Sequence, residues 1–197
     1  CIRDREGAGP NALDKNNYGA LAAGMGAFAS HGYSTAVGYN ATSVISSTSL
    51  GAASYATSNS AAVGVNAYAT NKGTSVGNNT QSANGVAIGY NATAGDFYKN
   101  LPGELFSSYS GTAIGNNAFA RGGVAVGASA SAEAYGVALG DRTYVSWRGS
   151  ALGDNASVLA NGGVALGPDA VADTAAGKIG FVATAAGQLS LIHISEP

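Results

Sequence analysis

Residues 111–127 read GTAIGNNAFARGGVAVG, and this stretch decides the fold of the chain. It holds two short runs that each end on a glycine, Thr112–Gly115 and Val124–Gly127, twelve residues apart. In each run a β-branched residue, an alanine and a second branched aliphatic residue alternate, which is a strand pattern too short for a helix. The glycine that follows permits a tight turn.

The same run recurs along the whole chain. A glycine preceded by a small aliphatic run stands at Gly24, Gly38, Gly51, Gly64, Gly77, Gly89, Gly115, Gly127, Gly140, Gly153, Gly167 and Gly180. The steps are 14, 13, 13, 13, 12, 26, 12, 13, 13, 14 and 13 residues. Because 26 is twice 13, we expect a degenerate coil between Gly89 and Gly115, with Gly103 near the place of its glycine. Such a period predicts a solenoid in which each repeat forms one coil.

Each position of the repeat has a consistent character. The residue before the glycine is aliphatic, and the residue before that is Ala or Ser in nearly every copy. Small residues recur three and five positions after the glycine, as Ala67 and Ala69 do, and we expect them to point inward. The pattern predicts two short strands per coil joined by two turns, the second made by sequences such as Asn84-Gly85.

The first strand of the coil is apolar on both faces, aliphatic on one and Ala or Ser on the other. One face can pack within its own coil, but the other needs a partner. A monomer would otherwise expose an apolar stripe larger than the few hundred Å² usual for soluble monomers. The pattern leaves open which face is inside and whether the partners number two or three.

Four copies carry a resemblance to a known family: residues 85–94, 111–120, 136–140 and 163–172. They resemble the head repeats of YadA-like trimeric autotransporter adhesins, and the match runs in register through nearly all of residues 18–188. The resemblance implies an all-β fold, a left-handed parallel β-roll with coils of about 13 residues, intertwined as a homotrimer. It also implies an adhesin head outside the bacterial outer membrane that binds a host extracellular-matrix protein or a cell-surface receptor. Stalk heptads and anchor strands are not visible in the sequence.

Other repeat classes fit less well. Hexapeptide acyltransferases have a six-residue period and a catalytic histidine, whereas His31 here reads as a turn residue before Gly32. Calcium-binding rolls place Asp in a glycine-rich nonapeptide, a frame that the acids after the coil glycines lack. Ice-binding solenoids present a threonine ladder, which valines interrupt here. A purely structural spacer or an ice-binding-type solenoid therefore remains the alternative function.

Composition narrows the function further. Only 10% of residues are charged and the net charge is −2, so neither nucleic acid nor an anionic membrane is expected as a partner. No apolar run is long enough to span or insert into a membrane. The sequence shows no catalytic constellation, cofactor motif or metal-ligand cluster, and we expect a non-catalytic binding protein without cofactor or metal.

Two groups of aromatic residues are the candidate ligand contacts. Tyr55 and Tyr68 stand four residues after their coil glycines, and alternation points them away from the alanine core. Residues 95–110 form an irregular insertion that gathers Phe97, Tyr98, Phe106 and Tyr109. We expect this insertion to leave the roll as a loop that either binds the ligand or folds back to cap the coils.

The two ends of the chain have a different character. Residues 189–197 can be encoded by a DNA stretch whose reverse complement, in one frame, encodes Cys1–Asp4 and begins an arginine codon. That DNA resembles the transposon-end adapter of sequencing libraries. We therefore expect residues 1–5 and 189–197 to be adapter-derived, residues 6–17 to be a leading segment, and residues 18–188 to be the β-roll.

Overall fold

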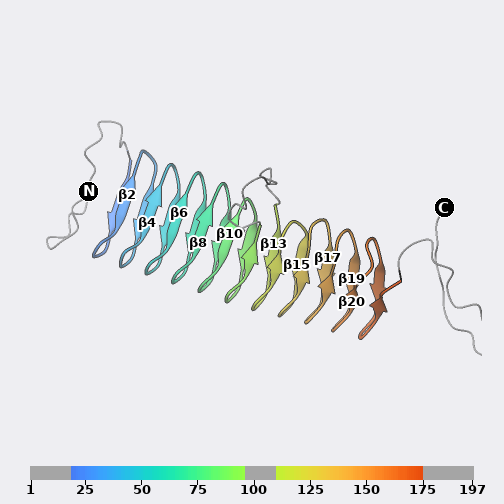
Figure 1. Cartoon of the computed structure of the whole chain (residues 1–197). Helices are drawn as coiled ribbons and strands as arrows, with labels where there is room; N and C mark the ends of the chain where they lie inside the picture. Colours follow the sequence, from blue (N-terminus) through green and yellow to red (C-terminus); the bar gives the residue numbers. More distant parts are fainter. Residues whose placement is uncertain (1–18, 96–109, 175–197) are drawn as a thin grey trace, which may run out of the picture.

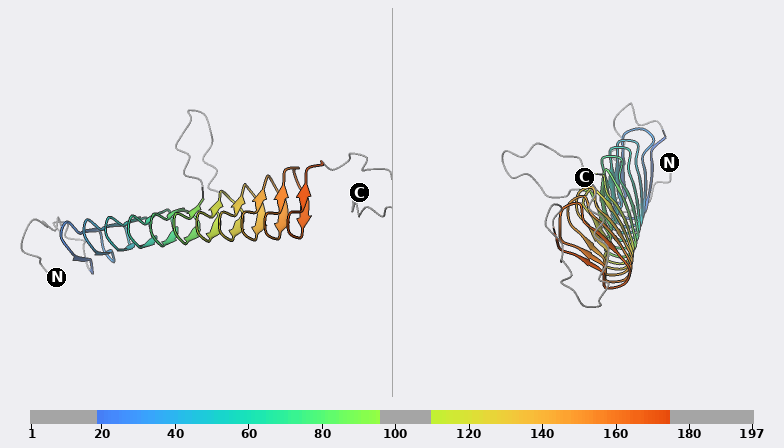
Figure 2. Two further views of the ribbon diagram at one scale, coloured as in Figure 1. Left: turned by 90° about the horizontal axis from the view of Figure 1, so that it is seen from below. Right: turned by 90° about the vertical axis from the view of Figure 1, so that its right-hand side faces the viewer.

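The computed structural model describes residues 19–95 and 110–174. They form an all-β solenoid whose coils stack into a gently twisted rod (Figures 1 and 2). Each coil contributes one strand to each of two parallel sheets, and each sheet has eleven strands. The predicted solenoid, with two strands in each coil of about 13 residues, is thereby confirmed for the part of the chain that the structure describes.

The odd-numbered strands form sheet A, which precedes the coil glycine. They are β1 (Leu21–Ala23), β3 (Thr35–Val37), β5 (Thr48–Leu50), β7 (Ala61–Val63), β9 (Thr74–Val76), β11 (Val86–Ile88), β13 (Thr112–Ile114), β15 (Val124–Val126), β17 (Val137–Leu139), β19 (Ser150–Leu152) and β21 (Val164–Leu166).

The even-numbered strands form sheet B, which follows the coil glycine. They are β2 (Phe28–Ser30), β4 (Thr42–Val44), β6 (Tyr55–Thr57), β8 (Tyr68–Thr70), β10 (Gln81–Ala83), β12 (Thr93–Ala94), β14 (Phe119–Ala120), β16 (Ser131–Ala132), β18 (Tyr144–Val145), β20 (Ser157–Val158) and β22 (Val171–Ala172).

Every strand pairs in parallel with the equivalent strand of the next coil. In sheet A, for example, Val124 faces Val137, one period of 13 residues further on. The turns continue the same ladder, as where the Gly140 amide donates to the Val126 carbonyl at 2.8 Å. These hydrogen bonds therefore run along the rod axis. Eleven coils at about 4.8 Å per coil give a rod about 50 Å long.

The interior of the rod is filled by small side chains from both sheets. The middle residue of every sheet A strand from β3 to β21 is buried, and that of β1 is partly buried, whereas the residues on either side of it are not buried. From sheet B, Ala67 and Ala69 are both fully buried, as the sequence predicts. The Ala and Ser face of sheet A is thus inside, and its aliphatic face points outward. The structure thus settles which face of sheet A lies inside, which the sequence pattern leaves open.

The recurring glycine is required by the backbone at the first turn. Gly64 has a φ of +132°, a region that side-chain-bearing residues hardly populate, and the coil glycines of neighbouring turns have similar values. A Cβ at Gly64 would overlap the main-chain carbonyl of Gly77 in the next coil. Two positions later the chain enters the left-handed region, where asparagine is the commonest residue, as at Asn66 with a φ of 55°.

The lining of the core changes along the rod. Before residue 95, the interior contains many buried hydroxyl groups, and each of these bonds to a carbonyl or to another hydroxyl. They belong to Ser34, Ser43, Ser47, Ser49, Ser54, Ser60, Ser75, Thr80 and Ser82. After residue 110, Thr143 is the one buried hydroxyl among the described residues, and alanine and valine fill the space. The core therefore mixes alanines with buried hydroxyl groups in its first half and is almost wholly apolar in its second.

In the second half of the rod, large valines in the core pack against glycines. Val145 and Val158 are fully buried at positions that hold Ala or Ser in other coils of sheet B. Glycines lie against them at the end of the second turn. A Cβ at Gly149 would come 2.5 Å from Val158 Cγ1 and 3.0 Å from Val145 Cγ1. Each large residue is thus accommodated because its neighbour has no side chain.

The 26-residue step between Gly89 and Gly115 contains one coil of the stack and not two, contrary to the expected additional degenerate coil. Strand β11 pairs directly with β13, placing Val86 opposite Thr112, and β12 pairs directly with β14. The Gly95 amide donates to the Ala120 carbonyl at 2.8 Å, so the ladder runs without a gap up to the insertion. Residues 96–109 are therefore inserted at a second turn. Their length imitates one extra period.

Candidate functional site

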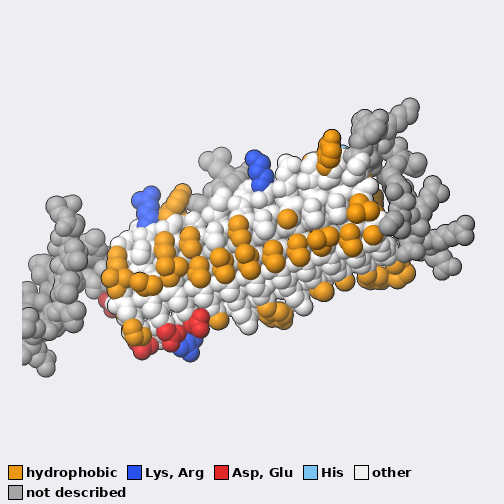
Figure 3. All heavy atoms as spheres, turned by 180° about the vertical axis from the view of Figure 1, so that it is seen from behind, with side chains coloured by type: hydrophobic (Ala, Val, Ile, Leu, Met, Phe, Trp, Pro, Cys, Tyr) orange, Lys and Arg blue, Asp and Glu red, His pale blue; other side chains and the backbone are white. Residues whose placement is uncertain are grey.

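The outer face of sheet A carries a continuous aliphatic row along the rod. The row is formed by the residue before each coil glycine: Ala23, Val37, Leu50, Val63, Val76, Ile88, Ile114, Val126, Leu139, Leu152 and Leu166. Its central members Ile88 and Ile114 are register partners, each 38% exposed. Figure 3 shows rows of apolar side chains that run along the length of the rod. We define the surface formed by these eleven residues as the aliphatic stripe.

A second row on the same face runs beside the stripe, two residues earlier in each strand. It is mixed, with threonine frequent in the first half and valine in the second: Leu21, Thr35, Thr48, Ala61, Thr74, Val86, Thr112, Val124, Val137, Ser150 and Val164. The valines and Ala61 break the threonine ladder that an ice-binding surface would need. Neither row contains a charged residue. The outer face of sheet A is therefore a flat, uncharged and largely apolar surface.

The outer face of sheet B presents the aromatic residues that the sequence singles out. Tyr55 and Tyr68 are register partners on β6 and β8, and their rings are stacked with centroids 5.0 Å apart and planes 9° apart. Phe119 and Tyr144 lie on the same column but pair with Thr or Ser in the neighbouring coils. The predicted outward orientation is confirmed, and Tyr55 with Tyr68 forms the one stacked aromatic pair of this column among the described residues.

Removing both rings of this stack should lower the melting temperature. Stacked aromatic pairs add about 0.5–1.5 kcal/mol beyond their buried area, so we expect the variant carrying Tyr55→Ala and Tyr68→Ala to melt earlier than the parent chain. Tyr144→Ala is the matched control, because its register partners are Ser131 and Ser157. The same variants test the ligand-contact prediction: if ligand binding is unchanged in the destabilised variant, Tyr55 and Tyr68 are not contact residues.

The stack also predicts a pH dependence. Burial raises the pKa of the Tyr68 phenol above its ordinary value of 10.0, and the neighbouring Tyr55 adds to the shift. Folded Tyr68 thus holds its proton more tightly than unfolded Tyr68. Its contribution to stability is complete below the unfolded pKa and is lost as the pH rises through the folded pKa.

We therefore expect the melting temperature to fall as the pH rises above about 10, and Tyr68→Phe to reduce that fall. Tyr144→Phe is the control, because Tyr144 is 39% exposed and Tyr68 is 40% exposed. Thermal scans monitored by circular dichroism measure the slope. Equal alkaline slopes for Tyr68→Phe and the parent chain would contradict the assignment.

The other predicted contact residues cannot be placed. Phe97, Tyr98, Phe106 and Tyr109 lie outside the described residues, as do the chain ends and Gly180. What the structure fixes is the base of the insertion, because β12 ends at Ala94 and β13 begins at Thr112. The insertion thus belongs to the edge of the rod formed by the second turns. His31 lies on the same edge as a turn residue with a φ of 72°, as predicted.

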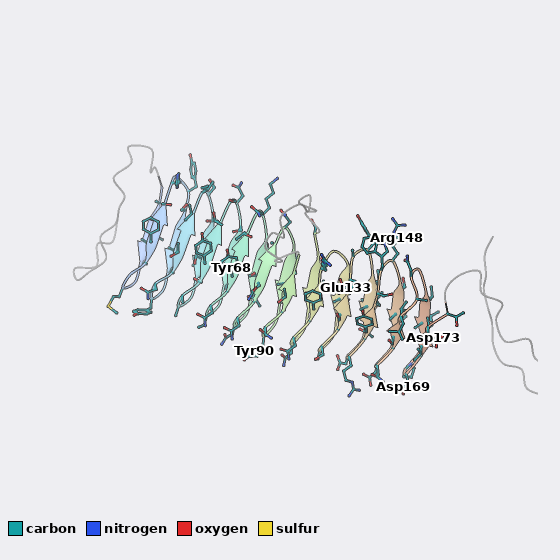
Figure 4. All side chains as sticks on the ribbon, viewed as in Figure 1. Tyr68, Tyr90, Glu133, Arg148, Asp169 and Asp173 are labelled. Carbon is teal, nitrogen blue, oxygen red and sulfur yellow. The ribbon has the colours of Figure 1, made fainter. Side chains whose placement is uncertain are left out.

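The opposite edge, formed by the coil glycine turns, carries a ladder of polar side chains. Asn66 Nδ2 donates to Asn79 Oδ1 at 3.1 Å, and Asn91 Nδ2 donates to Asn117 Oδ1 at 2.9 Å. Towards the far end the acids join the same ladder. Asp169 accepts from Asn155 at 2.8 Å, and Arg142 makes a two-pronged contact with Asp154 at 2.8 and 3.0 Å. The acids therefore tie neighbouring turns together. Asp169 is labelled on this edge, the lower one in Figure 4.

Pattern analysis did not find a third cluster of side chains. On the second-turn edge, Tyr135 and Trp147 lie edge to face with centroids 5.8 Å apart, and the Arg148 guanidinium lies 5.8 Å from the Tyr135 centroid. The signal was available, because Tyr135 and Arg148 occupy the same repeat position 13 residues apart. Strand alternation does not apply to turn residues, so it gives no indication of contacts between turns. We refer to Tyr135, Trp147 and Arg148 as the turn cluster.

Within the described residues, no group of three His, Cys, Asp or Glu side chains is placed to hold a metal ion. The same part of the chain contains no helix of the length and apolarity that a membrane crossing requires. The candidate functional surfaces are therefore the aliphatic stripe, the tyrosine stack and the turn cluster. In comparisons with known proteins, no family, curated protein or solved structure gives a significant match to this chain.

Proposed function

We propose that this chain is the head segment of a trimeric adhesin on the bacterial cell surface, outside the outer membrane. In this proposal three copies form an intertwined, left-handed β-roll that binds a host extracellular-matrix protein or cell-surface receptor without catalysis. The observation that carries the proposal is the aliphatic stripe, which follows the rod from β1 to β21. The resemblance of the repeats to YadA-like heads supports the same reading.

The stripe argues for association because no other segment of the described chain covers it. Ile88 and Ile114 keep 38% of their surface exposed although the core beneath them is sealed by fully buried alanines. Burying apolar surface yields about 25 cal/mol per Å², and a row repeated on every coil adds this gain along the whole rod. Three copies related by a rotation axis along the rod would each bury the same stripe.

The oligomeric state tests the first part of the proposal. We expect the whole chain to sediment as three copies, and we expect Ile88→Lys with Ile114→Lys to release monomers, because two charges would be buried without partners. The matched control is Gln81→Lys with Thr93→Lys, which places two adjacent lysines on sheet B. A well-folded monomer of the parent chain at tens of micromolar would contradict the trimer. Dissociation in both double variants would remove the stripe as its cause.

Adhesion tests the second part. The parent chain is applied to immobilised collagens, fibronectin and laminin and to epithelial cells, and we expect saturable binding to at least one of these surfaces. The alternative, a spacer or ice-binding solenoid, predicts no binding to any of them. Thermal hysteresis separates the two forms of that alternative, because only an ice-binding rod lowers the freezing point below the melting point.

A further inference from the structure

The turn cluster lies outside both the core and the two sheets. Trp147 and Arg148 belong to the turn between β18 and β19, and Tyr135 belongs to the turn one coil earlier. Figure 4 shows Arg148 on the edge away from Tyr90 and Asp169. Tyr135 is 57% exposed and Trp147 is 43% exposed, and in the next coil Leu159 is 57% exposed. Three successive coils thus present a large apolar side chain at the same edge.

The backbone at this cluster is in a conformation that bulky residues seldom adopt. Tyr135 has a φ of 62° and Arg148 a φ of 58°, both in the left-handed region. Some equivalent turns hold residues that suit this region better, such as Asn84 and Gly162, whereas others also hold bulky residues, such as Ile45 and Lys72. A tyrosine and an arginine in these places cost folding free energy.

The cluster is preorganised by its own contacts. The Tyr135 and Trp147 rings meet at 69°, so their exposed surfaces form a step and not a flat sheet. The Arg148 guanidinium lies over Tyr135, which restricts its rotation and leaves its planar set of donors on the edge. On the same edge, the Glu133 carboxylate lies 3.9 Å from Arg121 of the preceding coil. Asp173 is the other acid of this edge in the described chain.

These groups select for one ligand chemistry. An aromatic face attracts the polarised C–H groups on the apolar side of a sugar ring, and the tyrosine hydroxyl and indole N–H can bond to its hydroxyls. A guanidinium binds a carboxylate through two parallel hydrogen bonds. From the turn cluster we infer that this edge binds an acidic saccharide, stacked on Trp147 and Tyr135 with its carboxylate on Arg148.

An extended peptide fits the edge less well because the main chain there is already engaged. The amides of Tyr135 and Arg148 donate to Gly122 and Ala134 of the preceding coils at 3.2 Å, and the Gly162 amide donates to Trp147 at 3.0 Å. A peptide that adds as a strand needs such groups to be available. Recognition at this edge is therefore by side chains alone, which suits a small rigid ring.

The inference rests on the proposed function only in that the saccharide comes from a host surface. Trp147 is the one tryptophan of the chain, so its fluorescence reports on this site alone. The whole chain is titrated with a glucuronate-containing tetrasaccharide, with sialylated lactose and with lactose. We expect a saturable change with one or both acidic sugars, with a Kd on the order of 1 mM, and none with lactose. The two acidic sugars distinguish a uronic acid from a sialic acid as the source of the carboxylate.

Variants assign the binding to the cluster. Calorimetry and saturation-transfer NMR should show affinity reduced about tenfold in Arg148→Gln and at least as much in Trp147→Ala, because a charge-assisted bond and a stacking surface are lost. Tyr90→Ala is the control, with a tyrosine 53% exposed on the opposite edge. Circular dichroism confirms that each variant is folded.

Three results would overturn the inference. The first is no response to either acidic sugar at about 10 mM, tenfold above the expected Kd. The second is binding by Trp147→Ala that equals binding by the parent chain, and the third is a response to anionic lipid vesicles and not to sugars. Host-cell adhesion by a chain that binds no sugar would refute the saccharide and leave the proposed function intact. Sugar binding without adhesion would support the saccharide site and refute the proposed function.

Discussion

Replacing Gly64 with alanine is expected to cost on the order of 3 kcal/mol of unfolding free energy. Two penalties combine at this position. The φ of +132° is strained for any residue with a side chain, and the new Cβ would overlap the Gly77 carbonyl. That carbonyl cannot move freely, because the Gly77 amide is bonded to Val63 at 2.8 Å and the Gly64 amide to Leu50 at 2.7 Å.

Gly162→Ala is the matched control for Gly64→Ala. Gly162 also has a positive φ, +72°, but a Cβ there would have no neighbour within 4 Å. We expect it to cost about 1 kcal/mol, the usual penalty of the left-handed region for alanine. Chemical unfolding followed by circular dichroism gives both values. Equal losses in the two variants would show that contact between coil glycines is not what fixes glycine at the first turn.

The second large effect is expected where valine and glycine exchange volume. Gly149→Ala should destabilise the chain by about 2 kcal/mol, because its Cβ would lie 2.5 Å from Val158 Cγ1. Val158→Ala should also cost about 2 kcal/mol, since it leaves a cavity in a fully apolar part of the core. In the double variant the alanine at 149 finds the space left by the valine, and the loss should be smaller than the sum by at least about 1 kcal/mol.

A distant pair serves as the control for this cycle. Ser43 is buried in β4, far along the rod from Gly149, and its hydroxyl donates to the Ser47 carbonyl at 2.6 Å. Ser43→Ala combined with Gly149→Ala should therefore show additive losses. Additivity in the Gly149 and Val158 pair as well would mean that the two residues do not share volume, contrary to their positions in the core.

The coil could be predicted from the sequence because its rules are local. A φ that only glycine tolerates recurs at every first turn, so the period is written directly in the glycine spacing. The inward position of Ala67 and Ala69 and the outward position of Tyr55 and Tyr68 both follow from strand alternation. These predictions needed no knowledge of what lies across the rod.

The predictions that failed or stayed open depend on how the coils pack in three dimensions, which the residue pattern does not give. Alternation could not say which face of sheet A is inside, because Ala87 and Ile88 are both apolar. The narrow gap between the sheets decides it, and only Ala87 is fully buried. The 26-residue glycine step was interpreted as two coils because it is twice the period, whereas the direct pairing of Val86 with Thr112 leaves no additional coil there. Tyr135 and Trp147 meet only once their coils stack.

The axial direction of the hydrogen bonds determines how the rod responds to a pull along its length. Tension opens the bonds of the terminal coil first, while the bonds of the other coils stay closed, as in a zipper. Each coil of 13 residues that opens replaces about 4.8 Å of rod by about 45 Å of extended chain. In a rod held at one end and loaded at the other, each opened coil therefore becomes about nine times as long as it was in the stack. It would act as an extensible tether that limits the force reaching whatever is bound.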